Sequence, residues 1–422
     1  MPNLENRILN TKLSRRKLLT GSALTTGGVF AAAAGIERSR WTAVIDQWSD
    51  WKNSDKSNEK FLTENRNKLK NLKLGCSFSP EEFGINPQNI GPDKISEYEN
   101  VFKALDVIID DLGITDIRFG IRWSNAVDSK GNFNFSFYKP FVDHCLEKGA
   151  NICLNIGPLK TFRYPEEHPP QSVLQNVSSV PSRGQRITPD MDIAKEGVLQ
   201  MMEQLEYVKN NYDGKIGAFQ SDNEPNQSSG QFGWVMGSNY MISNIELIHA
   251  AFPNSQILVN AANPDNIGKI ATMFKKIIIS GQIETDKLIF GYDYYYKKPK
   301  LSDDPIIRWI DPITRARLAG NEDLKKNRQD AKKYGYKIEV TEGQAEAWKP
   351  YFSPGSSARE FRFMLLRCMN EVLDMSKQSL LRIWGAENVA LNIINGDLTD
   401  DHNNIIELIK KINPQKPKLY LF

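Results

Sequence analysis

Cysteine and histidine are scarce in this chain, which has four of each among 422 residues. The cysteines lie far apart and form no C-x-x-C pair, so we expect buried free thiols rather than a disulfide framework (Cys76, Cys145, Cys153 and Cys368). The histidines are equally scattered and show no H-E-x-x-H or similar ligand spacing. The sequence therefore predicts neither a metal site nor a bound cofactor.

Repeats and nucleotide-binding motifs are also missing from the sequence. No segment recurs at a fixed period, and no G-x-G-x-x-G or P-loop motif follows an apolar run, so solenoids and nucleotide-binding α/β folds are not favoured. The formal net charge is only +3, and residues 1–34 carry five basic residues against one acidic residue. The rest of the chain is thus close to neutral, which argues against a nucleic-acid partner.

The first 35 residues have the pattern of an export signal. Arg15 and Arg16 precede an uncharged stretch, residues 18–35, that is rich in Gly, Ser and Thr and includes Ala32-Ala33-Ala34. This pattern resembles a twin-arginine signal with a small-residue cleavage site. Because about 18 uncharged residues are barely enough to span a bilayer, an uncleaved membrane anchor is the alternative. Either reading predicts an exported protein, secreted or membrane-anchored.

Residues 36–71 combine three tryptophans with a run rich in Lys, Asn and Glu. We expect a short amphipathic segment and a polar tether here. The tryptophans fit either a membrane interface or a helix packed on the domain that follows.

From residue 72 to residue 422 the chain is expected to form one α/β domain. Eight short runs of β-branched, aromatic and other apolar residues predict strands. These runs are Leu72–Phe78, Ile117–Trp123, Asn151–Gly157, Lys215–Gln220, Ser255–Ala261, Lys287–Tyr294, Tyr336–Thr341 and Leu380–Trp384.

Amphipathic helical patterns alternate with these runs. They occupy Lys94–Leu112, Asp192–Tyr212, Asn239–Ala251, Asn266–Ser280, Asn321–Tyr334, Ala358–Ser376 and Asn403–Ile412. Eight strands that alternate with helices favour a closed (β/α)8 TIM barrel over an open sheet. In such a barrel the functional residues gather on the loops after the carboxyl ends of the strands.

Two glutamates stand at such strand ends. Glu224 lies in the segment Asn223-Glu224-Pro225 after the fourth strand, and Glu342 lies in Thr341-Glu342-Gly343 at the end of the seventh. Strands four and seven of one barrel can face each other across its mouth. Cleavage of a glycosidic bond needs two carboxyl groups on opposite sides of the bond, one protonated and one ionised.

These two motifs, in these two positions, resemble the large clan of retaining glycoside hydrolases built on the (β/α)8 barrel, which includes cellulases, mannanases and β-galactosidases. The resemblance covers the chain from about residue 72 to its end. It implies that Glu224 is the general acid/base and that Glu342 is the nucleophile.

The same resemblance suggests roles for several other residues. Arg118 on the second strand would hold the nucleophile ionised, and Asn223 would bind the sugar 2-hydroxyl. Tyr295 after the sixth strand would hydrogen-bond the nucleophile, although packing is an equal alternative among three successive tyrosines. Trp384 would form the floor of the subsite for the attacked sugar, and Trp348 is a candidate substrate platform.

One position departs from the clan's pattern. Asp293 on the sixth strand stands where many members carry a histidine, and a third acidic group there would raise the pKa of the acid/base. Lys160 and Arg163, in the loop after the third strand, are candidates for substrate contact without an assigned role.

The expected activity is hydrolysis of a β-linked oligo- or polysaccharide by double displacement. Two alternatives stay open: a transglycosylase that uses the same two glutamates, and a non-catalytic carbohydrate-binding barrel.

Overall fold

The computed structural model of this chain describes residues 63–64, 69, 72–85, 95–294, 326–344, 379–398 and 400–413. The expected export signal and nearly all of the expected tether lie outside these residues. Among the helices that are described, none is long and apolar enough to cross a membrane.

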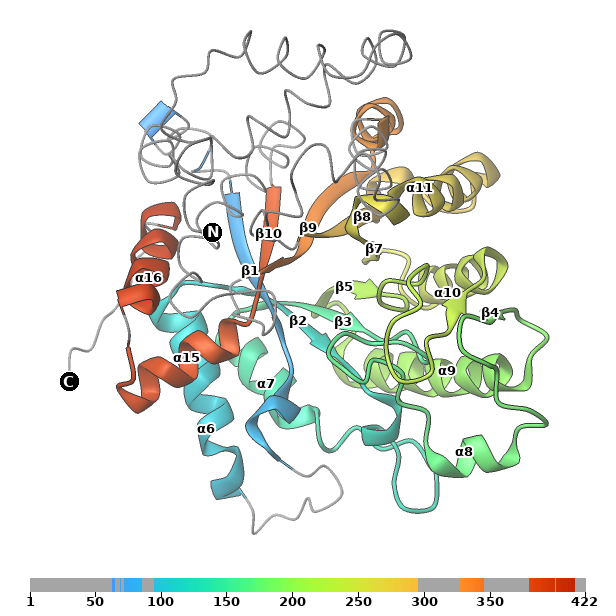
Figure 1. Cartoon of the computed structure of the whole chain (residues 1–422), viewed down its shortest axis with the longest axis horizontal. Coiled ribbons are helices and arrows are strands. Elements are labelled where there is room, and N and C mark those ends of the chain that lie inside the picture. Colours follow the sequence, from blue (N-terminus) through green and yellow to red (C-terminus); the bar gives the residue numbers. More distant parts are fainter. Residues whose placement is uncertain are drawn as a thin grey trace, which may run out of the picture.

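Eight parallel strands close into a barrel, as the sequence predicts (Figure 1). Around the barrel the order is β1, β10, β9, β8, β7, β5, β3 and β2, with β2 pairing again with β1. The strands are β1 (Leu72–Phe78), β2 (Asp116–Gly120), β3 (Asn151–Asn155), β5 (Ile216–Gln220), β7 (Gln256–Ala262), β8 (Leu288–Tyr294), β9 (Lys337–Gln344) and β10 (Ser379–Trp384). All eight predicted strands are confirmed, with ends that differ by a few residues.

The helices lie around this barrel and cover the strands from outside (Figure 1). Strands that are covered on the outside and packed on the inside are buried on both faces, which explains the continuous apolar run Ile257–Val259 within β7. The helices are α6 (Ile95–Asp106), α7 (Lys139–Glu147), α8 (Gln171–Asn176), α9 (Asp192–Tyr212), α10 (Ser238–Ala251), α11 (Asn263–Ser280), α15 (Ala386–Asn395) and α16 (Asp400–Ile412).

The structure refines the predicted helices at several points. The pattern at Lys94–Leu112 is α-helical only as far as Asp106 and continues as one π-helical turn, η4 (Val107–Asp111). Residues 326–334 are helical within the predicted Asn321–Tyr334, while the predicted helix Ala358–Ser376 lies outside the described residues. The sequence did not predict α7, α8 or α15.

Small elements complete the loops between the barrel strands. β4 (Arg186–Ile187) and β6 (Val235–Met236) form a two-stranded sheet outside the barrel. Single 3-10 turns are η1 (Pro80–Phe83), η5 (Trp123–Asn125) and η6 (Thr285–Lys287).

A buried ionic group fills the barrel interior near the amino end of β2. The Arg382 guanidinium contacts Asp116 Oδ1 at 2.8 Å and Glu339 Oε2 at 2.6 Å. All three side chains are less than a tenth exposed, so each charge depends on the others for its solvation. Three of the cysteines, Cys76, Cys145 and Cys153, are buried free thiols, as expected, and Cys368 lies outside the described residues.

Candidate active site

Glu224 and Glu342 meet at the mouth of the barrel. Glu224 follows the carboxyl end of β5, and Glu342 lies near the carboxyl end of β9. One carboxylate oxygen from each, together with one from Asp293 on β8, lies within 4.8 Å of the other two. Strands that are far apart in sequence thus bring three carboxyl groups together.

Arg118 on β2 pairs with Glu342. Its Nη2 donates to Glu342 Oε1 at 2.5 Å, and both side chains are almost completely buried. The same guanidinium donates from Nε to Ser77 Oγ at 3.0 Å and from Nη1 to Gln220 Oε1 at 3.1 Å. A guanidinium held at this distance by several bonds fixes the orientation of the carboxyl group that it contacts.

Asp293 faces Glu342 because the register between β8 and β9 is irregular. Tyr292 pairs with Val340, but the next residue, Asp293, pairs with Glu342, so Thr341 is passed over. Bulges of this kind re-aim side chains and are frequent beside active sites. The Thr341 hydroxyl then donates to Asp293 Oδ1 at 2.5 Å.

The protonation of the cluster follows from its crowding. Desolvation of its carboxyl group and the negative charge of Glu342 raise the pKa of Glu224 to about 7. Burial, followed by the charges of Glu342 and Glu224, raises the pKa of Asp293 well above its ordinary value. The expectation that Asp293 raises the pKa of Glu224 is wrong in sign, because the hydrogen bond from Asp293 lowers that pKa.

Asn260 on β7 is a hub of this site that sequence reasoning missed. Its Oδ1 accepts from the backbone N–H of Glu224 at 3.0 Å, and its Nδ2 donates to Asp293 Oδ2 at 2.8 Å and to Asn223 Oδ1 at 2.9 Å. Gln220 Nε2 also donates to Asn223 Oδ1, at 3.2 Å. These bonds orient the Asn223 amide beside Glu224. The available signal was a single buried amide within an otherwise apolar strand.

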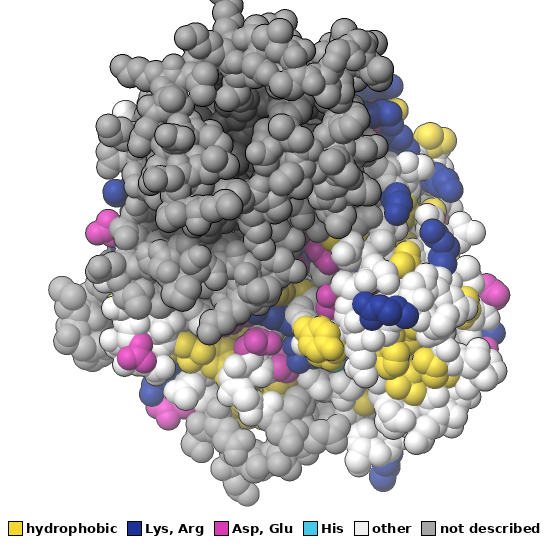
Figure 2. Space-filling view, in the orientation of Figure 1, with side chains coloured by type: hydrophobic (Ala, Val, Ile, Leu, Met, Phe, Trp, Pro, Cys, Tyr) yellow, Lys and Arg dark blue, Asp and Glu magenta, His cyan; other side chains and the backbone are white. Residues whose placement is uncertain are grey.

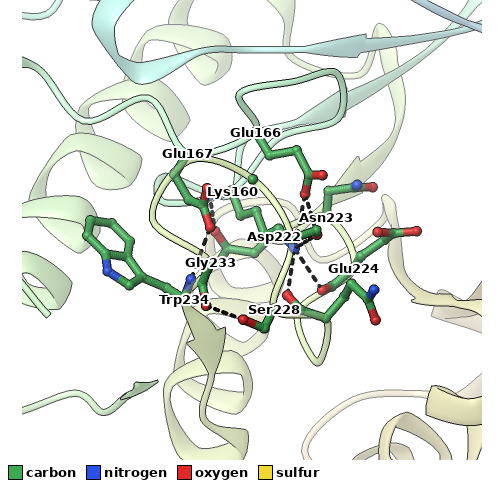
Figure 3. Close-up of polar contacts among 12 residues, drawn as sticks. Lys160, Glu166, Glu167, Asp222, Asn223, Glu224, Ser228, Gly233 and Trp234 are labelled. Atoms are coloured by element: carbon green, nitrogen blue, oxygen red, sulfur yellow. Dashed lines mark hydrogen bonds and ion pairs between the residues drawn. The ribbon is translucent and has the colours of Figure 1, made fainter. Parts of the chain in front are cut away.

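Lys160 does not reach toward substrate. Its side chain is completely buried, and its ammonium lies inside the loop that follows β5 (Figure 3). The carboxyl group of Glu224 points away from this ammonium (Figure 3). Substrate contact, one of the expectations for Lys160, is therefore not supported.

Trp384 at the end of β10 is a buried residue with neighbours on its ring. The Arg163 guanidinium carbon lies 4.2 Å over the indole, and Phe162 meets the ring edge-on at 5.9 Å between centroids. Arg163 in turn donates to Glu387 Oε2 at 2.9 Å. One face of Trp384 is thus covered by a cation, so a sugar would have only the other face. The subsite role of Trp384 stays a prediction.

Two of the predicted site residues, Tyr295 and Trp348, lie outside the described residues. On the face drawn in Figure 2, the described part carries both acidic and basic side chains.

Comparisons with known proteins give structural similarities only. No family model and no curated protein matches the chain. A family 10 endoxylanase from a sugarcane soil metagenome is 12% identical, with 77% of this chain and 87% of that one covered and a TM-score of 0.45. Xylanase 10B from Thermotoga petrophila is 11% identical, with 76% and 85% covered and a TM-score of 0.45.

A family 30 subfamily 8 xylanase from Clostridium acetobutylicum is 13% identical, with 74% of this chain and 64% of that one covered and a TM-score of 0.41. Because these TM-scores are below 0.5, the similarities carry no argument here. The barrel is established by the strand pairing of this chain, and its chemistry is argued from the side chains at the barrel mouth.

Proposed function

We propose that this protein is a retaining glycoside hydrolase that cleaves a β-linked glycan by double displacement. The observation that carries the proposal is the pair Glu224 and Glu342, whose carboxylate oxygens lie within 4.8 Å across the barrel mouth. One member is paired with a buried guanidinium, and the other is held near a pKa of about 7. Two carboxyl groups with different protonation are what glycosidic cleavage requires.

In the first step Glu342 attacks the anomeric carbon and the bond to the leaving oxygen breaks. Glu224 gives its proton to that oxygen, so the leaving group departs as an alcohol and a glycosyl ester remains on Glu342. In the second step Glu224, now ionised, removes a proton from water. The water oxygen attacks the anomeric carbon, Glu342 leaves as a carboxylate and Glu224 regains its proton.

The environments of the two glutamates support this division of roles. Arg118 neutralises Glu342 and fixes its oxygen, which suits a group that must be ionised and aimed. A pKa of about 7 leaves Glu224 protonated in weakly acidic solution and able to release its proton near neutral pH.

The spacing of the pair supports direct attack. Retaining enzymes hold the carboxyl groups about 5 to 5.5 Å apart, whereas inverting enzymes leave about 6.5 to 9.5 Å for a water molecule. One oxygen of Glu224 lies within 4.8 Å of one oxygen of Glu342, which leaves little room for a water molecule between those two atoms. The product is therefore expected to keep the β configuration, and proton NMR of fresh hydrolysate would reveal an inverted anomer if the assignment is wrong.

The test compares Glu342→Ala and Glu224→Ala, with Glu203→Ala on the exposed face of α9 as the matched control. Glu342→Ala should abolish turnover of every substrate because the first step has no nucleophile. Glu224→Ala should lose about 10²- to 10⁴-fold on glycosides with poor leaving groups. It should keep the first step on an aryl glycoside with an acidic phenol and accumulate the glycosyl-enzyme.

Azide separates the roles further, since it attacks without a base. It should rescue Glu224→Ala and give a β-glycosyl azide, whereas Glu342→Ala should give the α-azide or nothing. Equal losses with no burst in either variant would reject this catalytic pair. Transfer to added sugar in place of hydrolysis would favour the transglycosylase, and binding of glycans without any turnover would favour a carbohydrate-binding barrel.

A further inference from the structure

Lys160 is a fully buried lysine at the base of the loop that carries Glu224. Burial of an ammonium group is costly unless oxygen atoms replace its water shell. Four oxygens lie within reach of Lys160 Nζ: Glu224 O at 3.3 Å, Gln227 O at 2.9 Å, Ser229 Oγ at 2.7 Å and Glu166 Oε2 at 3.0 Å. Three of the four belong to the loop after β5, so the ammonium holds that loop from inside (Figure 3).

The backbone of Lys160 is tied to the same loop. Its N–H donates to Asp222 Oδ1 at 2.8 Å, and its carbonyl accepts from the N–H of Asn223 at 2.8 Å. Residues on both sides of the Glu224 peptide unit are thus anchored to this one residue of the loop after β3.

Glu224 itself adopts an unusual backbone conformation, with φ at +41°. A residue with a side chain reaches this left-handed region only at a cost in free energy, and the surrounding contacts must hold it there. At Glu224 those contacts are the bond from its N–H to Asn260 and two bonds to its carbonyl, one from the Gln227 N–H at 2.9 Å and one from the Lys160 ammonium.

We propose that Lys160 is a positioning residue for Glu224: its buried ammonium fixes the Glu224 carbonyl and the following loop, and thereby sets where the acid/base carboxyl lies. This inference rests on the proposed function. Lys160 touches no reacting atom, so its effect must pass through Glu224.

The expected signature is therefore a dependence on the leaving group. In Lys160→Met, kcat/KM for a glycoside with a sugar leaving group should fall about 10²-fold, the effect of a misplaced catalytic group. For a dinitrophenyl glycoside, whose departure needs no acid, kcat/KM should change less than about threefold. Azide should raise kcat on that second substrate.

Lys160→Met leaves Glu166 without its buried partner and could unfold the loop, so a second variant is needed. Lys160→Met/Glu166→Gln removes both members of the ion pair and leaves the local net charge unchanged, while the bonds to the loop are still lost. It should show the same selective loss. Lys209→Met on α9, whose ammonium donates to Ala251 O at the surface, is the control and should behave like the unaltered protein.

The comparison with Glu224→Ala on the same two substrates keeps the outcomes apart. Suppose that Glu224→Ala shows the selective loss, but that in both Lys160 variants kcat/KM falls equally for the two substrates or does not fall for either. The positioning role is then wrong and the proposed function stands. If Glu224→Ala itself shows no selectivity, the proposed function fails.

Discussion

Asp293 should carry a proton throughout the working pH range, and Asp293→Asn tests this. The residue accepts hydrogen bonds from Asn260 Nδ2 at 2.8 Å and from the Thr341 hydroxyl at 2.5 Å, and it is hydrogen-bonded to Glu224. Burial and two neighbouring carboxylates raise its pKa well above the ordinary value. An uncharged Asp293 is a hydrogen-bond donor to Glu224, and the introduced amide can take over that function.

The size of the effect follows from the geometry. A negative charge within 4.8 Å of Glu224 would interact with it by about 3.5 kcal/mol at an effective dielectric constant of about 20, or about 2.5 pH units. If Asp293 were ionised, its removal would lower the pKa of Glu224 by up to that amount. A protonated Asp293 carries no charge, and for that state we expect a change of less than about half a pH unit.

The measurement is kcat/KM against pH on a glycoside with a sugar leaving group. The alkaline limb of this profile follows loss of the proton from Glu224, so a lower pKa would move the limb to lower pH. The limb should stay in place in Asp293→Asn and in Asp286→Asn, a surface control near the amino end of β8. A shift of the Asp293→Asn limb to lower pH by more than about one unit would show that Asp293 is ionised.

Three further variants test other parts of the molecule. Arg382→Met leaves two buried carboxylates unpaired and should lower the free energy of unfolding by about 3 to 5 kcal/mol in urea titrations; an unchanged value would refute the buried ion group. Gly157→Ala places a Cβ 2.2 Å from the backbone N of Asp222, so we expect a melting temperature lower by several degrees, which a thermal scan would show. Replacement of Arg15 and Arg16 by lysine should abolish export of the folded protein; normal export would disprove a twin-arginine signal.

The barrel could be predicted from the sequence because each of its strands is a separate apolar run between turn signals. Their short length and the helical patterns between them favour parallel strands, and β1 and β5 were found within one residue of their observed ends. Short helices carry less signal. α7 has nine residues and α15 ten, and two or three turns give few repeats of the helical period.

The candidate site was predictable only in part. Glu224, Glu342 and Arg118 occupy strand ends or strands, so the topology itself brings them together. The direction of the Lys160 side chain is different, because it depends on loop contacts between residues more than 60 positions apart. No local pattern encodes such contacts. The predicted direction of the effect of Asp293 on the pKa of Glu224 was wrong for a similar reason. That direction depends on which of the two hydrogen-bonded carboxyl groups holds the proton, and no local sequence pattern encodes this.

The backbone strain of the described residues gathers in the two loops that Lys160 joins. Three residues other than glycine have positive φ there: Arg163 at +74°, Glu166 at +64° and Glu224 at +41°. Each such residue costs about 1 to 3 kcal/mol and persists only where its surroundings hold it. Arg163 is held by Trp384 and Glu387, Glu166 by Lys160, and Glu224 by Lys160 together with Asn260. The favourable free energy of these contacts thus offsets the cost of the strained backbone instead of adding to the stability of the fold. In return, side chains are held at fixed positions around the barrel mouth, which is what a site for displacement chemistry requires.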